Sequence, residues 1–195
     1  MKTTAFFSIL LALSACGTAD DQDAVDVPDA AIADEADAAP PAAVEPTIEA
    51  LEACEAEAFE PPALEGPGMG APPEGAVVAS ATVLYLRPGA AAKAQFLEVL
   101  GPVAATLATS DGLLAQALTY DDRCGVARTF TVWRDAAAMY GFVASPAHVA
   151  AMAQQGEFGR PESTVVHWEV APDAFPPTWD EALDVVRAAP SLGER

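Results

Sequence analysis

Only two histidines occur in the 195-residue chain, and His148 lies in its most distinctive segment, TFTVWRDAAAMYGFVASPAHVAAM (129–152). An imidazole can accept a proton near neutral pH, so His148 could act as a general base or orient a substrate. A single histidine is more often a hydrogen-bonded structural group, which makes packing the alternative. Tyr85, whose hydroxyl could orient a bound molecule, is the second candidate catalytic residue.

Aromatic side chains could build a pocket around such a site. A flat apolar pocket of this kind would suit an aromatic or lipid-like small molecule, with tyrosine hydroxyls fixing its orientation. The same side chains could instead serve only core and dimer packing, where aromatic rings dominate burial. Both interpretations remain open for the candidate pocket residues, which are Tyr120, Trp133, Tyr140, Phe142 and Trp168.

A metal site is the next chemistry to consider. His148, His167 and Glu169 would together form an iron-type ligand set of two imidazoles and a carboxylate. However, His167 and Glu169 belong to one expected strand and His148 to another element, so we predict no metal. The chain has no nucleophile elbow, C-x-x-C, H-E-x-x-H or Walker motif, and we expect no cofactor.

The elements that must position these residues follow from hydrophobic periodicity and turn signals. The order is β-α-β-β-α-β plus a C-terminal helix, which predicts an α+β, ferredoxin-like sheet with two helices on one face. Gly101-Pro102 should bend or split the first helix, and Ser145-Pro146 should restart the second. The expected strands are 77–86, 112–120, 126–133 and 163–171, and the expected helices are 90–109, 139–155 and 178–188.

The strands carry apolar side chains on both sides of the sheet. In the fourth strand, for example, Val166, Trp168 and Val170 lie opposite Val165. A small domain with such a two-sided sheet must cover its second face. We therefore expect a homodimer that packs sheet against sheet.

The first 15 residues have the features of a signal peptide, with Lys2 before an apolar run that is too short to span a bilayer. The sequence LSAC resembles the lipobox of bacterial lipoproteins, which implies lipidation of Cys16. Gly17 in the next position implies the outer membrane of a Gram-negative bacterium. We expect a cell-envelope protein that is tethered by lipid on Cys16 and has no further membrane span.

The formal charge of −20 is concentrated near the N-terminus. Residues 17–74 hold 16 of the 29 acidic residues and no Lys or Arg, and they are rich in Ala and Pro. We predict that 16–74 is a lipidated cysteine followed by a disordered linker, that 75–172 is the folded domain, and that 173–195 is a terminal helix and tail. So acidic a chain is not expected to bind nucleic acid.

Within the linker, TIEALEACEAEAF (47–59) is an exception, because its apolar residues have helical spacing. It could form a short helix that docks on the domain through Cys54, or it could stay unstructured. If Cys16 carries lipid, Cys54 and Cys124 remain as an even pair in an oxidising compartment. We predict a disulfide between them, with two free thiols as the alternative.

The sequence TVWRDAAAMYGFVASPAHVAAM, after a strand-helix-strand of this spacing, resembles the antibiotic-biosynthesis-monooxygenase-like family of dimeric α/β barrels. The resemblance covers roughly residues 76–171. It implies a ferredoxin-like protomer, a sheet-packed dimer and a pocket between sheet and helices. Members of the family include cofactor-free oxygenases acting on polycyclic phenols and quinols, and haem-degrading enzymes.

The haem-degrading branch is not expected here. Its tryptophan and its haem-ligating histidine align with Phe142 and Met152, and the first strand lacks its asparagine. The resemblance therefore implies a cofactor-independent monooxygenase that acts on an aromatic or quinol-type molecule, with His148 assisting proton removal. The alternative is a non-catalytic, small-molecule-binding or stress-related envelope module on the same fold.

Overall fold

The structure is a computed structural model that describes residues 45–57, 59–70 and 73–194. The predicted signal peptide, the lipidation site Cys16 and most of the acidic linker lie outside these residues. No single helix in the described part of the chain is long and apolar enough to cross a membrane. Two consecutive helices, 136–143 and 146–158, reach that length and apolar character only when taken together, and their axes are bent by 64° at the break between them.

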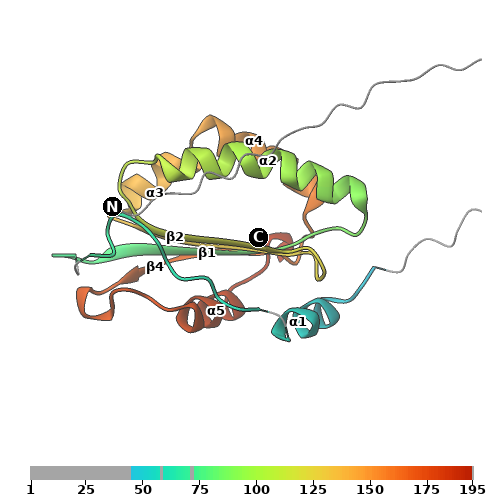
Figure 1. Cartoon of the computed structure of the whole chain (residues 1–195), viewed down its shortest axis with the longest axis horizontal. Helices are drawn as coiled ribbons and strands as arrows, with labels where there is room; N and C mark the ends of the chain where they lie inside the picture. The colour runs from blue at the N-terminus through green and yellow to red at the C-terminus, as the bar shows by residue number, and fades with distance from the viewer. Residues whose placement is uncertain (1–44, 58, 71–72, 195) are drawn as a thin grey trace, which may run out of the picture. The chain divides into compact units, whose positions relative to one another are not determined.

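Four antiparallel strands form one sheet in the order β2-β3-β1-β4. They are β1 (Val77–Tyr85), β2 (Leu113–Asp121), β3 (Val126–Trp133) and β4 (Thr164–Val170). One face is covered by α2 (Ala90–Ala108), α3 (Ala136–Val143) and α4 (Pro146–Phe158), as Figure 1 shows. The predicted α+β, ferredoxin-like fold is therefore confirmed.

The ends of the helices show why the second helical segment is broken. Ser145 caps α4, because its Oγ accepts a hydrogen bond from the backbone amide of His148 at 3.4 Å. The restart predicted at Ser145-Pro146 is thus confirmed. Of the bend or split predicted at Gly101-Pro102, the split does not occur, because α2 continues through both residues. Both residues are exposed, so water can satisfy the carbonyl group that loses its amide partner at Pro102.

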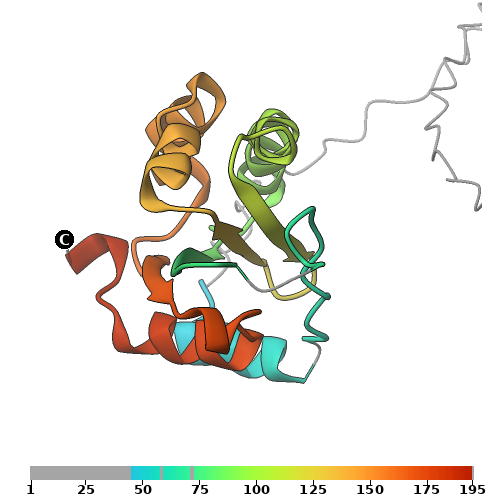
Figure 2. The ribbon, with the colours of Figure 1, turned by 90° about the vertical axis from the view of Figure 1, so that its left-hand side faces the viewer.

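The opposite face of the sheet is covered by α1 (Ile48–Ala56) and α5 (Trp179–Ala188), which both lie below the sheet in Figures 1 and 2. Phe130 of β3 is 0% exposed at the centre of this face. Its ring stacks on Trp168 at 5.9 Å and meets the edge of Trp179 of α5 at 5.1 Å. The chain itself therefore covers the face that we expected a second copy to cover, and the homodimer stays a prediction.

The linker prediction is wrong for the residues that form α1. Leu51 is buried against β1 and β3, and Cys54 forms a disulfide with Cys124, with a Cα–Cα distance of 5.8 Å. The predicted disulfide is therefore confirmed, as is the alternative that this segment docks as a short helix. Composition suggested disorder, but one cross-link and one buried leucine are enough to hold nine residues on the sheet.

The chain after α1 is also ordered, which corrects the linker prediction for residues 59–70. Glu65 and Gln116 form a β-bridge through two backbone hydrogen bonds of 3.0 and 2.8 Å, so this segment lies along the outer edge of β2. Trp179 donates its indole N–H to the carbonyl of Pro62 at 2.8 Å. These contacts are between distant parts of the sequence, which local composition does not reveal.

Candidate functional site

The sheet separates the predicted site residues into two groups. His148, Trp133, Phe142, Tyr140 and Tyr120 lie on the side of α2, α3 and α4. Tyr85 and Trp168 lie on the side of α1 and α5, where they contact Leu51 and Phe130. The structure therefore does not bring these residues together in one pocket.

His148 belongs to a stack of rings beneath α3 and α4. Trp133 is 1% exposed, and its ring stacks on Phe142 with centroids 5.5 Å apart. Phe142 in turn meets the His148 imidazole at 4.8 Å in an edge arrangement. Burial lowers the pKa of His148 below its ordinary value, so the ring is neutral at pH 7. Its Nδ1 is buried and has no hydrogen-bond partner among the described residues.

A row of polar side chains crosses all four strands on the same side. Ser80 pairs with Thr131 on one side and His167 on the other, and Thr131 pairs with Gln116. The Tyr140 hydroxyl lies 3.4 Å from Nε2 of His167. The side-chain oxygen of Gln116 is buried and lacks a partner in the described part of the chain. This row can hydrogen-bond to a polar group placed beneath the helices.

Sequence reasoning missed Ser80, Thr131 and Gln116 as a set. Each is a polar residue among apolar neighbours in its own strand, which is a visible but weak signal. Only the pairing register places them side by side, and a shift of one residue in any strand would turn that residue to the other face.

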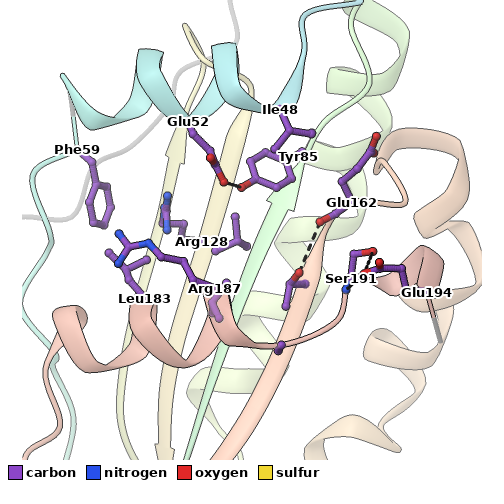
Figure 3. A pocket seen from close by; sticks show the side chains of 14 residues that line it. Ile48, Glu52, Phe59, Tyr85, Arg128, Glu162, Leu183, Arg187, Ser191 and Glu194 are labelled. Atoms are coloured by element: carbon purple, nitrogen blue, oxygen red, sulfur yellow. Dashed lines mark hydrogen bonds between the residues drawn. The ribbon is translucent and has the colours of Figure 1, made fainter.

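A cavity of about 420 Å³, the α1–α5 cavity, lies on the other side of the sheet (Figure 3). Its walls come from α1, the middle of the sheet, and α5 with the chain that follows it. The Tyr85 hydroxyl donates a hydrogen bond to Oε1 of Glu52 at 3.0 Å across one wall. Its lining residues are Ile48, Glu52, Phe59, Val83, Tyr85, Arg128, Glu162, Thr164, Leu183, Val186, Arg187, Ala189, Ser191 and Glu194.

Two arginine side chains of the α1–α5 cavity are held by their neighbours, whereas Oε2 of Glu162 is buried and has no hydrogen-bond partner among the described residues. The Arg128 guanidinium lies over the Phe59 ring, 4.9 Å from its centroid. Arg187 donates to Asp184 at 2.9 Å on the outer side of α5. Because the apolar walls and the Tyr85–Glu52 pair meet in one space, the cavity suits a molecule with an apolar body and a hydrogen-bonding group.

A second cavity of about 410 Å³, the disulfide cavity, lies where α1 meets the start of α2 and the β2–β3 turn. Cys54 and Cys124 line it, and so does Tyr120, one of the predicted pocket residues. The Tyr120 hydroxyl donates to Asp122 at 3.0 Å. Burial, together with this hydrogen bond to a carboxylate, raises the pKa of Tyr120 to about 12, so its phenol stays protonated.

The described residues contain no group of three or more His, Cys, Asp or Glu side chains placed to hold a metal ion. His167 and Glu169 are both exposed on β4, whereas His148 packs on Phe142. The ligand set considered from the sequence is therefore not assembled.

A family model described as a domain of unknown function, DUF3291, matches residues 90–194, which is more than half of the chain. The chain belongs to the DUF3291 family. The matched residues run from α2 to the end of the described chain and include α5. In this DUF3291 protein, α1 and β1 lie before the matched region, so the Tyr85–Glu52 pair and Cys54 come from residues outside it.

The DUF3291 chain is also similar in structure to several solved proteins. Rv0793 from Mycobacterium tuberculosis is 22% identical with a TM-score of 0.43, over 47% of this chain and 92% of that one. SnoaB from Streptomyces nogalater, a cofactor-independent oxygenase, is 19% identical with a TM-score of 0.39, over 52% and 98%. A candidate antibiotic biosynthesis monooxygenase from Caulobacter crescentus is 20% identical with a TM-score of 0.43, over 50% and 92%.

No curated protein matches the chain. The solved structures named above include proteins described as oxygenases, the class that the sequence resembles. With identities below 25%, these similarities concern the fold and transfer no activity to this DUF3291 protein. Its function has to be argued from its own cavities and side chains.

Proposed function

We propose that this DUF3291 protein is a small-molecule-binding module of the cell envelope, and that its ligand occupies the α1–α5 cavity. The observation that carries this proposal is a cavity of about 420 Å³ in which apolar side chains from α1, β1 and α5 lie beside the Tyr85–Glu52 hydrogen bond and other polar groups. Binding sites for small molecules commonly enclose about 300 to 1,000 Å³ and combine apolar walls with a few placed polar groups.

The lining also suggests the class of ligand. Ile48, Val83 and Val186 offer apolar contact from α1, β1 and α5 respectively. One carboxylate oxygen of Glu52 accepts a hydrogen bond from the Tyr85 hydroxyl. The second oxygen can accept a hydrogen bond from a ligand hydroxyl. The ligand is therefore an aromatic or lipid-like molecule that carries a hydroxyl group, such as a phenol or a quinol.

Replacing Tyr85 by phenylalanine or Glu52 by glutamine should weaken binding about fivefold to tenfold, because the first change removes the hydrogen bond that holds Glu52 and the second replaces the charged acceptor by a neutral amide. The measurement is calorimetric titration with a panel of phenols, quinols and long-chain alcohols. Tyr120→Phe is the matched control, since it removes the same kind of tyrosine–carboxylate bond in the other cavity. Binding that is absent from the whole panel, or weakened equally by Tyr120→Phe, contradicts the proposal.

A second candidate function is a cofactor-independent monooxygenase acting on an aromatic or quinol substrate beneath α3 and α4. It is favoured by two buried polar atoms on that side, Nδ1 of His148 and the side-chain oxygen of Gln116, for which no hydrogen-bond partner is found among the described residues. His148 is neutral at pH 7 and so can take a proton from a phenolic substrate.

If this second candidate is right, His148→Ala should lower oxygen uptake with the active quinol or phenol by about a hundredfold, the usual contribution of a general base. Activity of the wild type should persist to a lower pH than an exposed histidine would allow, because burial holds the pKa of His148 below its ordinary value. Met152→Ala, an exposed change on the same helix, is the control. A wild type without oxygen uptake, or a His148→Ala protein of unchanged activity, rules the oxygenase out.

The envelope location rests on the lipobox-like sequence that ends at Cys16. Acyl chains on one cysteine give stable anchoring when more than one is present. In a Gram-negative host, the wild type should therefore take up labelled palmitate and sediment with the outer membrane. Cys16→Ser should lose the label and at least about nine-tenths of the membrane-bound fraction. Label or membrane association that persists in Cys16→Ser argues against lipidation at this residue.

A further inference from the structure

The Cys54–Cys124 disulfide forms part of the wall of the disulfide cavity instead of being enclosed in the core. Cys124 is 4% exposed, whereas Cys54 on α1 is only partly buried. A small molecule in this cavity can therefore reach the sulfur of Cys54 more easily than that of Cys124. Access of this kind distinguishes an exchangeable disulfide from an inert structural one.

The cavity is also locally basic in a very acidic chain. Arg87, Lys93 and Arg123 line it, although the chain has only nine Lys and Arg residues and a net charge of −20. Two carboxylates form salt bridges with these basic side chains: Asp122 pairs with Lys93, and Asp121 lies 3.6 Å from Arg123. Arg87 donates instead to the backbone carbonyl of Gly156 at 3.0 Å, and no carboxylate among the described residues forms a salt bridge with it.

We propose that Cys54–Cys124 is a redox-active disulfide, reduced from this cavity by an anionic low-molecular-weight thiol, and that its reduction releases α1. The basic side chains attract the anion and stabilise the thiolate form that attacks. The disulfide cavity is a different site from the α1–α5 cavity, and its substrate, an anionic thiol, differs in class from the ligand proposed there. Its effect on ligand binding, described below, rests on the proposed function.

The exchange proceeds in two steps. The thiolate of the reductant attacks the sulfur of Cys54, a mixed disulfide forms, and the electron pair of the broken bond leaves on Cys124, which takes a proton from water. A second thiolate of the reductant then attacks the reductant's own sulfur in the mixed disulfide, and the electron pair of the broken bond leaves on Cys54, which takes a proton from water. The products are two cysteine thiols and the disulfide of the reductant, so two electrons pass from the thiols to the protein.

Helix α1 depends on this bond for its position. It has nine residues, and isolated helices of that length are marginal in water. Its other attachments are the buried side chain of Leu51, the hydrogen bond from Tyr85 to Glu52, and that from Arg160 to the carbonyl of Pro46. Because Ile48 and Glu52 also line the α1–α5 cavity, release of α1 removes one wall of the proposed binding site.

The first test compares three thiols of similar size and different charge: mercaptoethanesulfonate, mercaptoethanol and cysteamine. Their rates of reducing the oxidised full chain at low ionic strength are divided by their rates with a neutral small-molecule disulfide. We expect the anionic thiol to exceed the cationic one about tenfold, and the ratio to approach one at high salt. The net charge of −20 alone predicts the opposite order, so a cationic thiol that is equal or faster overturns the proposal.

Arg87→Gln should remove most of this preference, whereas Arg134→Gln should keep it. Arg134 is an exposed arginine that follows β3 and pairs with Asp111 and Asp135, and it does not line the disulfide cavity. An equal loss of preference in both variants would show a general charge effect, and that result also overturns the proposal.

The second test follows hydrogen exchange of the α1 amides in the oxidised and the reduced full chain. We expect reduction to raise their exchange rates at least about tenfold while the amides of β1 and β3 stay protected. Unchanged protection of α1 overturns its release. Ligand affinity is then measured in both forms: if the oxidised chain binds nothing from the panel, the proposed function fails, and the exchange data still decide the release of α1.

Discussion

Replacing Cys54 and Cys124 together by serine should lower the free energy of unfolding by about 4 kcal/mol, the value that chain-entropy models give for a closed loop of this size. The disulfide joins residues 70 positions apart, so it excludes many extended conformations of the unfolded chain. It also fixes α1 on the sheet, and Leu51 depends on that position for its burial. Urea unfolding of the two proteins under oxidising conditions measures the difference.

The same experiment in the presence of a reductant is the internal control. There the wild type and the Cys54→Ser/Cys124→Ser protein should have the same midpoint, because both lack the cross-link. Under oxidising conditions, the free energy of unfolding of the double variant should also depend more steeply on urea than that of the wild type, since the unfolded state without the cross-link exposes more surface. A loss below about 1 kcal/mol under oxidising conditions would mean that the disulfide adds little to stability.

Phe130→Ala should cost about 4 kcal/mol of unfolding free energy, within the range for removing a buried aromatic ring. The Phe130 ring is 0% exposed and lies between the rings of Trp168 and Trp179. Its removal leaves a cavity beneath α5 and weakens the only aromatic contact that the described residues show between β3 and that helix. Thermal or urea unfolding measures the cost.

Leu97→Ala is the control for Phe130→Ala, because Leu97 lies on α2 and is 45% exposed. It should change stability by less than about 0.5 kcal/mol. Tryptophan fluorescence gives a second readout, since Trp179 loses its apolar neighbour and its emission should shift to longer wavelength. A Phe130→Ala protein as stable as Leu97→Ala would contradict the central position of this ring in the core.

Local sequence signals predicted the strands and the helices on one face well. Alternation and β-branched residues marked the strands, and Ser145-Pro146 marked the start of α4 through a cap that the structure contains. At the start of α5 the hydroxyl of Thr178 accepts from the amide of Glu181, but the Glu181 carboxylate accepts from the Trp168 indole at 2.8 Å and does not return a bond to Thr178. A tertiary contact has replaced the local one.

The covering of the second sheet face could not be predicted from local signals. The apolar side of α5 can be read from its sequence, but not whether it packs on its own sheet or on another molecule. The α1–α5 cavity depends on that packing, so the hydrogen bond between Tyr85 and Glu52 could not be predicted from the sequence neighbours of either residue. Trp133, by contrast, is buried in the core, as its residue type favours.

The Glu65–Gln116 bridge has a consequence for how molecules of this protein behave beside one another. An uncovered edge strand offers unpaired amide and carbonyl groups to which a strand of a neighbouring molecule can add. Here residues 65–68 occupy the edge of β2, and the amide of Gly68 also donates to the carbonyl of Leu114 at 2.8 Å. Gly66 and Gly68 permit this close approach, because a Cβ atom at either position would collide with Leu114. The segment after α1 thus protects this part of the β2 edge against the addition of a strand from a neighbouring molecule, because the chain's own backbone already occupies it.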